Sequence, residues 1–398
     1  MGKSMLAALL LSVSAGAAMA GPTVKIGVMN DRSGVYADAT GQGSVVAAEM
    51  AVADYAKSLG LTVEVVSADH QNKADVGASI ARQWYDRDKV DAIFDVPTSS
   101  VGLAVNQVSR EKNKAFINSG AATADLTGAQ CAPYTIHWTY DTYSQANGTA
   151  GALTRRGGDT WFFLTADYAF GHAMERDARQ TVLKDGGKVV GAVRTPFPAT
   201  DFSSFLLQAQ ASKAKVIGLA NAAGDTANAI KQAGEFGIVE GGQNLAALLI
   251  FIGEIRALGP KAAQGLILTE GFYWDLNDAT RAFSKRFGER LSGRMPNMIQ
   301  AGVYSSLVHY MKGVAATQST DAAKVVEWMK ANPTDDPLFG KGTIRADGRK
   351  MHDMYLFEVK KPSESKSEWD LYKVLATIPA EKAFRPIAEG GCPLVNKS

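Results

Sequence analysis

The sequence predicts an α/β fold of two similar lobes, and three observations support this prediction. Apolar runs of strand length alternate with amphipathic runs of helix length along most of the chain. This alternation is typical of parallel sheets that are covered by helices on both faces. The alternation also restarts near the middle of the chain, and the two halves are of similar length. We therefore expect two consecutive Rossmann-like units.

Each unit contains four expected strands and three expected helices. In the first unit the strands are expected at 24–29, 61–67, 90–96 and 114–118, and the helices at 43–58, 74–86 and 99–111. In the second unit the strands are expected at 160–164, 188–194, 215–219 and 245–251, and the helices at 170–185, 202–211 and 225–236. The seam between the units is expected near 142–149.

The elements after the second unit are too few for a third lobe. We expect a strand at 265–269 and helices at 278–291 and 298–316 to complete the first lobe, and strands at 354–359 and 369–374 to rejoin the second. Lobe I is thus expected over 21–142 and about 262–345, and lobe II over 143–261 and about 346–398 with the C-terminal tail. Chain crossings between the lobes would form a hinge that can close a cleft over a ligand.

Residues 1–20 have the layout of a secretory signal peptide. Lys3 precedes an apolar stretch over 5–18, and Ala18 and Ala20 are the small residues that signal peptidase requires near its cleavage point. The apolar stretch is shorter than the roughly 20 residues of a membrane-spanning helix. We therefore expect residues 1–20 to be cleaved and the remaining chain to enter the periplasm.

Composition and motifs exclude several function classes. The formal net charge is +2, and basic and acidic residues are interspersed, so no nucleic acid partner is expected. The five histidines are scattered, whereas a zinc or redox site needs clustered ligands, so neither a metal nor a cofactor is expected. The chain lacks a phosphate loop, a paired-histidine metal helix and a Gly-x-Ser-x-Gly elbow. We therefore expect a binding protein and not an enzyme.

The two cysteines, Cys131 and Cys392, both lie in the mature chain. In an exported protein two cysteines most simply form one disulfide. This bond would tie the C-terminal tail to a loop that is distant in sequence. Two free buried thiols are the alternative.

Two turns at successive strand ends are candidates for ligand contact. In open α/β sheets, ligands bind beyond the carboxyl ends of the strands, near the N-termini of helices. The turn at 97–100 follows the strand at 90–96, and the loop at 119–123 follows the next strand. Hydroxyl groups and free N–H groups at helix starts suit a carboxylate, which nominates Ser99 and Thr123. The alternative is that both residues are ordinary helix N-caps.

Aromatic and polar side chains follow other strand ends. Aromatic rings in loops that face a cleft can enclose an apolar or aromatic solute. Their alternative role is packing in the core or the hinge. The candidates are Tyr36, Tyr168, Asn221 and Phe272.

Five segments together carry a family resemblance that covers nearly the whole mature chain in order. They are 24–34, 97–100, 120–123, 167–171 and 231–234. In these segments the chain resembles the branched-chain amino acid binding proteins of ATP-binding cassette (ABC) transporters. The resemblance implies a type I periplasmic binding fold, with three crossings between the lobes and closure on the ligand. It also implies an ABC permease in the inner membrane as partner, and we expect a monomer. By the resemblance, Ser99, Ser100, Ala121 and Thr123 grip a ligand carboxylate, and Tyr168 or Phe170 lines the pocket.

The chain departs from the amino acid binders where they hold the α-ammonium group. Their two acidic positions correspond here to Ala166 and to Ile250 or Phe251, and Asn221 replaces a tyrosine. A buried ammonium group without an anionic partner costs several kcal/mol. We therefore expect a small carboxylate with an aromatic or apolar body, as in the relatives that carry aromatic acids.

Three alternatives remain open at this point. Asp167 could turn inward and allow a branched-chain amino acid, or the ligand could be an amide, a urea or another small polar solute. A periplasmic sensor that presents its solute to a receptor would have the same sequence features.

Overall fold

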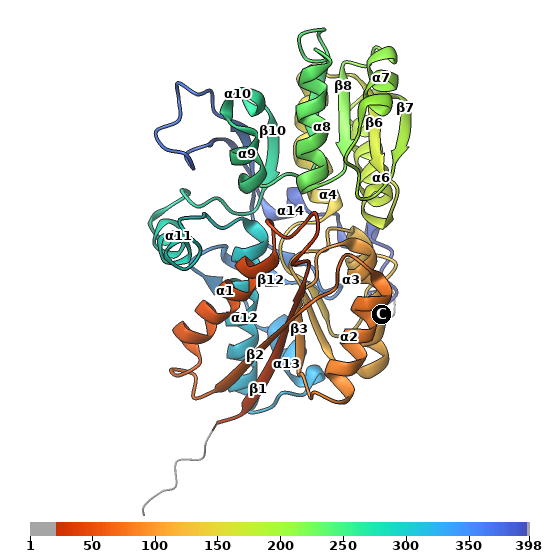
Figure 1. Ribbon diagram of the computed structural model, residues 1–398. Helices are drawn as coiled ribbons and strands as arrows, with labels where there is room; N and C mark the ends of the chain where they lie inside the picture. Colours follow the sequence, from red (N-terminus) through yellow and green to blue (C-terminus); the bar gives the residue numbers. More distant parts are fainter. Residues whose placement is uncertain (1–20, 396–398) are drawn as a thin grey trace, which may run out of the picture.

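Buried apolar strands build two separate parallel sheets in the computed structural model, which describes residues 21–395. The two sheets lie in two lobes that are stacked along the long axis of the molecule (Figure 1). The expected signal peptide, 1–20, lies outside the described residues. Within the described part of the chain, no helix combines the length and the hydropathy that crossing a bilayer requires.

Lobe I is built around a five-stranded parallel sheet with the strand order β2-β1-β3-β4-β5. The strands are β1 (Thr23–Asn30), β2 (Thr62–Asp69), β3 (Ala92–Asp95), β4 (Ala115–Asn118) and β5 (Thr135–His137). The helices between them are α1 (Gly41–Tyr55), α2 (Ala74–Asp86), α3 (Ser99–Lys112) and the 3-10 helix η1 (Ala124–Thr127). All residues of β3 and β4 are buried, as expected for strands covered on both faces.

Helices from the later part of the chain complete lobe I. They are α11 (Asp278–Arg290), α12 (Met298–Thr317) and α13 (Ala322–Ala331). The long helix α12 packs against α1, α13 and β3, and because it has neighbours on several sides most of its residues are buried. A small antiparallel sheet follows, formed by β11 (Thr334–Asp336), β12 (Gly340–Ile344) and β13 (Lys350–Met351).

Lobe II contains a four-stranded parallel sheet with the order β7-β6-β8-β9. Its strands are β6 (Thr160–Ala166), β7 (Lys188–Thr195), β8 (Val216–Ala220) and β9 (Asn244–Ala247). The chain enters this lobe through α4 (Thr142–Gln145), the π-helical turn η2 (Ala146–Ala150) and α5 (Gly151–Arg155). Its other helices are α6 (Ala169–Lys184), α7 (Ser203–Ala211), α8 (Ala223–Glu235), α9 (Ile252–Leu258) and α10 (Pro260–Ala263).

A three-stranded antiparallel sheet lies beside lobe II. It pairs β10 (Ile267–Glu270), β14 (Met354–Val359) and β15 (Tyr372–Ile378), and α14 (Ala380–Ala383) and the 3-10 helix η3 (Ile387–Glu389) follow it. We expected the strand at 265–269 to return to lobe I, but β10 hydrogen-bonds β14 instead. Its antiparallel partner β14 comes about 90 residues later in the chain, and a local sequence pattern does not reveal pairing over that separation. The limits of the lobes otherwise remain a prediction.

Three passages of the chain between the lobes lie side by side. They contain Thr139, Gly271 and His352. The carbonyl oxygen of Thr139 accepts a hydrogen bond of 2.6 Å from Arg349 Nη2 and lies 2.8 Å from His352 Nε2. A Cβ atom on Gly271 would stand 2.7 Å from the His352 ring. This arrangement confirms the expected hinge of three crossings.

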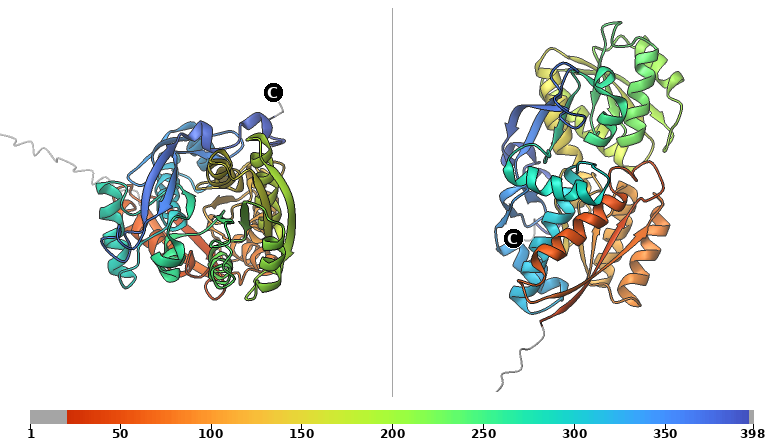
Figure 2. Two further views of the ribbon diagram at one scale, coloured as in Figure 1. Left: turned by 90° about the horizontal axis from the view of Figure 1, so that it is seen from above. Right: turned by 60° about the vertical axis from the view of Figure 1, so that its left-hand side comes forward.

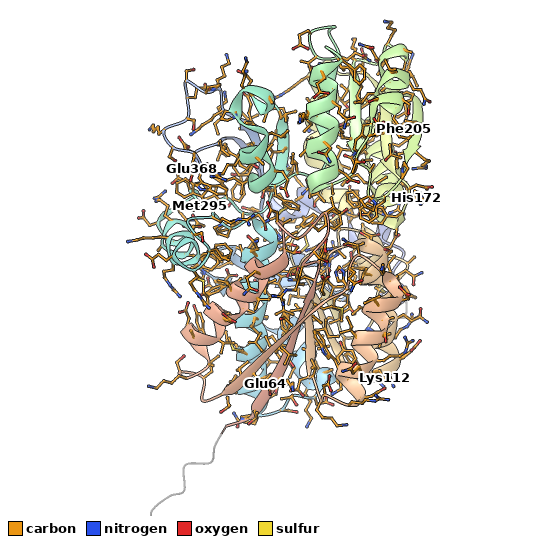
Figure 3. The ribbon with its side chains drawn as sticks, viewed as in Figure 1. Glu64, Lys112, His172, Phe205, Met295 and Glu368 are labelled. Carbon is orange, nitrogen blue, oxygen red and sulfur yellow. A yellow bond between two sulfur atoms is a disulfide. The ribbon has the colours of Figure 1, made fainter. Side chains whose placement is uncertain are left out.

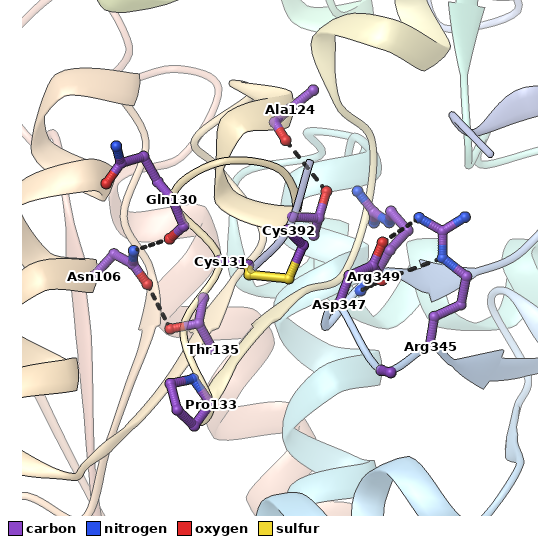
Figure 4. Close-up of a disulfide and its surroundings, with 12 residues drawn as sticks. Asn106, Ala124, Gln130, Cys131, Pro133, Thr135, Arg345, Asp347, Arg349 and Cys392 are labelled. Carbon is purple, nitrogen blue, oxygen red and sulfur yellow. Dashed lines mark hydrogen bonds and ion pairs between the residues drawn. A yellow bond between two sulfur atoms is a disulfide. The ribbon is translucent and has the colours of Figure 1, made fainter. Parts of the chain in front are cut away.

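The Cys131–Cys392 disulfide is present, with 5.6 Å between the two Cα atoms (Figure 4). Cys131 lies between η1 and β5, so the bond fastens the C-terminal tail to lobe I. The neighbouring loops are also in close contact, since a Cβ atom on Gly128 would meet the carbonyl oxygen of Gly390 at 2.7 Å. In Figure 2 the C-terminal part of the chain, in blue, runs along one side of both lobes. The tail that we assigned to lobe II therefore ends on lobe I.

Candidate functional site

A pocket with about 310 Å³ of empty space, part of it open to solvent, lies between the lobes at the carboxyl ends of the parallel strands. Four of the nominated residues line it: Tyr36, Ser99, Tyr168 and Phe170. Tyr36 follows β1, and Ser99 is the first residue of α3. Tyr168 and Phe170 stand at the start of α6, so both lobes contribute to the pocket.

The polar end of the pocket is the start of α3. Thr98 has a φ of 72°, in the left-handed region, and this conformation turns the chain from β3 into the helix. Ser99 Oγ accepts a hydrogen bond of 3.1 Å from the Thr123 N–H. The serine hydroxyl hydrogen and the N–H groups of Ser99 and Ser100 remain able to donate to a ligand, whereas the Val101 N–H donates to the Thr98 carbonyl oxygen. Donors at a helix N-terminus suit a negatively charged group.

Aromatic rings from both lobes form another part of the pocket wall. The Tyr36 and Tyr168 hydroxyl groups lie 2.5 Å apart. Phe197 stacks on Tyr168 with 4.0 Å between the ring centroids and on Tyr36 with 5.7 Å. Tyr140 packs edge to face against Phe251 at 6.1 Å. This wall suits an apolar or aromatic body.

A single carboxylate holds the loop that carries Tyr36. The Asp31 side chain accepts hydrogen bonds from the N–H groups of Ser33, Gly34 and Tyr36 at 3.3, 2.8 and 2.8 Å. It also accepts one from Asn72 Nδ2 at 2.6 Å. Because Asp31 is fully buried, the loop is held against lobe I by bonds that water does not weaken.

Acidic groups lie near the pocket but not on its surface. None of the described residues that line it is acidic. Burial raises the pKa of Tyr36 well above its usual value, and Tyr168 and Asp225 add to this effect. Burial also raises the pKa of Asp225 to about 7, although its carboxylate accepts a 3.2 Å hydrogen bond from the Ala199 N–H. Asp225 therefore favours the neutral form much more than an exposed aspartate does.

The other nominated residues do not line the pocket. Ala121 and Thr123 are buried behind it, and Thr123 Oγ1 accepts a hydrogen bond from the Asp125 N–H as the cap of η1. Asn221 accepts a hydrogen bond from the Thr226 hydroxyl, while its neighbour Ala222 lines the pocket. Phe272 packs in the core, 6.3 Å from Phe283 between ring centroids. Ser100 is half-buried on α3. Contact of these residues with a ligand stays a prediction.

Asp167 points away from the pocket. Its side chain is 59% exposed and lies 2.8 Å from His172 Nε2, within hydrogen-bond distance. Figure 3 shows His172 on the outside of the molecule. The preceding residue, Ala166, is buried at the end of β6. The inward turn that would allow an amino acid ligand is therefore not the conformation of this chain.

Several lining residues escaped the sequence analysis. Tyr140 follows β5, which has only three residues and was not recognised as a strand. Leu249 lies in an apolar run that we expected to be strand throughout, but β9 ends at Ala247. Ile299 lies in the first turn of α12 and does not follow a strand, so a search of the loops after strands does not find it. Of these three residues, only Tyr140 had a signal in the sequence, as an aromatic residue after a short apolar segment.

Two lobes with parallel sheets, three crossings and a pocket between them define a bilobal solute-binding protein. The chain belongs to the periplasmic binding protein family, whose model matches residues 23–366. Members of this family are substrate-binding proteins of ABC transporters, and the chain is not an enzyme.

Known structures and sequences agree with this assignment. A periplasmic binding protein from Burkholderia mallei is 53% identical, with a TM-score of 0.91, over 94% of this chain and 99% of that chain. A branched chain amino acid ABC transporter periplasmic ligand-binding protein from Burkholderia xenovorans is 41% identical, with a TM-score of 0.82, over 93% and 99%. The Leu/Ile/Val-binding protein homolog 6 of Brucella abortus is 24% identical over 89% of this chain and 92% of its own.

Proposed function

We propose that this chain is the periplasmic receptor of an ABC importer, and that its ligand is a small carboxylate with an aromatic or apolar body. The observation that carries the proposal is the composition of the pocket. Ser99 and the start of α3 supply hydrogen-bond donors, and aromatic rings from both lobes supply much of the remaining lining. The expected signal peptide and the family support export to the periplasm and delivery of the ligand, by a monomer, to a permease in the inner membrane.

The lack of an acidic lining residue argues against an amino acid. A buried ammonium group needs an anionic partner, and its absence costs several kcal/mol. Asp167 points outward, and the pKa of Asp225 is raised to about 7 by burial. A carboxylate without an amino group needs no such partner.

Related proteins support both this proposal and its main alternative. Solute-binding proteins from R. palustris have been solved in complex with benzoate and with 4-hydroxybenzoate, at 21% and 22% identity to this chain. The B. xenovorans and Brucella relatives are named for branched-chain amino acids. An amino acid is therefore the second candidate ligand, and the pocket composition makes us prefer the acid.

Transport would follow from closure of the lobes. A ligand that contacts both lobes stabilises the closed form by its differential affinity for that form. Tyr36 of lobe I and Tyr168 of lobe II both line the pocket, so a bound solute would contact both lobes. The closed form would then be the one that docks on the permease.

A thermal-shift screen of residues 21–398 tests the proposal. The panel contains aromatic carboxylates, branched-chain amino acids, short amides and small organic acids. A ligand that binds only the folded protein raises its melting temperature with increasing saturation. We expect shifts with the aromatic acids alone. A shift with leucine or valine, and none with the acids, would support the alternative ligand.

A further inference from the structure

A second cavity adjoins the pocket on its outer side. It has about 780 Å³ of empty space and lies between the loop after β1, the start of α9 and the segment before α12. The two cavities share Ala39. Phe251 and Ile299 line the inner pocket, and the residues that follow them, Ile252 and Gln300, line the outer cavity. The outer cavity therefore borders the inner pocket along these residues.

The Glu254 carboxylate lies in this cavity, and none of the described cationic side chains forms an ion pair with it. It is 6% exposed, and its Oε2 atom accepts a 3.2 Å hydrogen bond from the Phe251 N–H at the start of α9. Helix capping thus occupies one carboxylate oxygen and leaves the other free. Burial raises the pKa of Glu254 to about 7.

The two guanidinium groups that line the cavity are already paired. Arg294 forms an ion pair of 2.9 Å with Asp38. Arg32 donates to Ser67 Oγ and to Gln42 Oε1 at 2.8 and 2.7 Å. Neither guanidinium group forms an ion pair with the Glu254 carboxylate.

Gln300 contributes a free donor to the same cavity. Its Oε1 atom accepts a 3.1 Å hydrogen bond from the Asn297 N–H. Its amide nitrogen has no hydrogen-bond partner among the described residues, although the side chain is only 5% exposed. The cavity therefore offers a ligand a free acceptor on Glu254 and a free donor on Gln300, in exchange for hydrogen bonds to water.

We propose that the Glu254 carboxylate accepts a hydrogen bond from a polar substituent at the end of the ligand remote from its carboxylate, in a subsite that Gln300 borders. Amino, amide and hydroxyl groups have this chemistry. The ligand would be an elongated acid whose apolar body lies in the inner pocket. This inference rests on the proposed carboxylate ligand and specifies its far end.

The test compares matched acids in one protein. Benzoate, phenylacetate and phenylpropionate are each titrated by calorimetry with and without a para-amino group. The measured quantity is the ratio of the two dissociation constants within each pair. We expect the amino form to bind about tenfold more tightly in at least one pair, equivalent to about 1.4 kcal/mol.

Two variants change this ratio in opposite directions. In Glu254→Gln the amide oxygen can still accept from the Phe251 N–H, so the amide nitrogen faces the cavity and meets the ligand donor with another donor. The ratio should then fall to about one. Gln300→Glu keeps the bond to the Asn297 N–H and adds an acceptor, so the ratio should rise. Asp75→Asn, which removes an exposed first-turn carboxylate from α2, is the matched control and should leave the ratio unchanged.

The outcomes separate the subsite from the proposed function. Binding of the acids without any gain from the para-amino group, or a gain that survives in Glu254→Gln, would overturn the subsite alone. If none of the acids binds the parent protein, both the carboxylate ligand and the subsite are wrong. Melting curves of the unliganded variants verify that each is folded.

Discussion

The Tyr36 hydroxyl lies 2.5 Å from the Tyr168 hydroxyl, which joins lobe I to lobe II directly over the pocket. Phe197 stacks on both rings, so the contact is aromatic as well as polar. The two lobes also approach each other closely at Gly224 of lobe II, where an added Cβ atom would lie 2.9 Å from Val35 Cγ2 of lobe I. The loop after β1 therefore forms a contact between the lobes that opening must break.

Tyr36→Phe should shift the protein toward the open form. The substitution removes the hydroxyl pair and keeps the ring that stacks on Phe197. A hydrogen bond contributes about 1 kcal/mol net, so ligand affinity should fall about fivefold. Calorimetry measures the affinity, and small-angle scattering measures the radius of gyration without ligand. Tyr134→Phe, on a half-buried tyrosine of lobe I, is the control, and an equal effect of both substitutions would contradict this role.

Ser99→Ala should weaken ligand binding about tenfold, while Ser100→Ala should have little effect. Ser99 lines the pocket, and its neighbour does not. Thr123→Ala should mainly lower the melting temperature of the unliganded protein, because Thr123 caps η1 from behind the pocket. Dissociation constants and melting curves of the three variants distinguish these effects. If Ser99→Ala and Ser100→Ala bind ligand equally well, the pocket does not use the start of α3.

Reduction of the Cys131–Cys392 bond should lower the free energy of unfolding by about 2–5 kcal/mol. The bond closes a loop over 261 residues of sequence and holds the tail to lobe I. Denaturant unfolding with and without reductant measures the change. Mass spectrometry that found two free thiols in periplasmic material would contradict the bond itself.

His309 should make the protein less stable in acid. Burial lowers its pKa from 6.5 to about 4, and its Nε2 atom lies 3.1 Å from the Met329 carbonyl oxygen. The folded state therefore resists protonation. The contribution of neutral His309 to the free energy of unfolding is complete above pH 6.5 and is lost as the pH falls toward 4. The total loss is about 3 kcal/mol.

His309→Gln provides the comparison, because its amide nitrogen can still donate to the Met329 carbonyl. The free energy of unfolding should fall less between pH 7 and pH 5 in this variant than in the parent. The comparison between variants is needed because Asp95 has the opposite effect on the pH dependence of stability. Burial raises the pKa of Asp95 to about 7. Its contribution to the free energy of unfolding therefore decreases as the pH rises from about 4 to 7. His172→Gln, at an exposed position, is the control, and equal pH dependence in the parent and His309→Gln would exclude the role of His309.

Local patterns predicted the longer elements well. The expected helix at 74–86 matches α2, which has a helical apolar period, and the expected strand at 354–359 matches β14, a short apolar run bounded by charged residues. The three-residue strand β5 was too short to recognise. The apolar run at 245–251 was assigned wholly to a strand, because buried loop and buried strand have the same composition.

The pocket was predicted only in part, for a geometric reason. Ligands of open α/β sheets bind beyond the carboxyl ends of the strands, and this rule identifies which loops reach the cleft. It correctly nominated four lining residues, which are Tyr36, Ser99, Tyr168 and Phe170. It does not determine which side chain of a loop faces the ligand, so Ala121 and Thr123 were nominated although their neighbour Ala122 lines the pocket. That choice depends on backbone dihedrals and on bonds such as the one from the Thr123 N–H to Ser99 Oγ.

The central claim is that the pocket binds a carboxylate without an α-ammonium group. Phenylpropionate and phenylalanine differ only in that group, so calorimetric titration of residues 21–398 with both tests the claim directly. We predict that phenylpropionate binds at least about tenfold more tightly, because the pocket offers no acidic lining residue to the ammonium group. Tighter binding of phenylalanine would contradict the account and would mean that an acidic group such as Asp225 reaches the ligand.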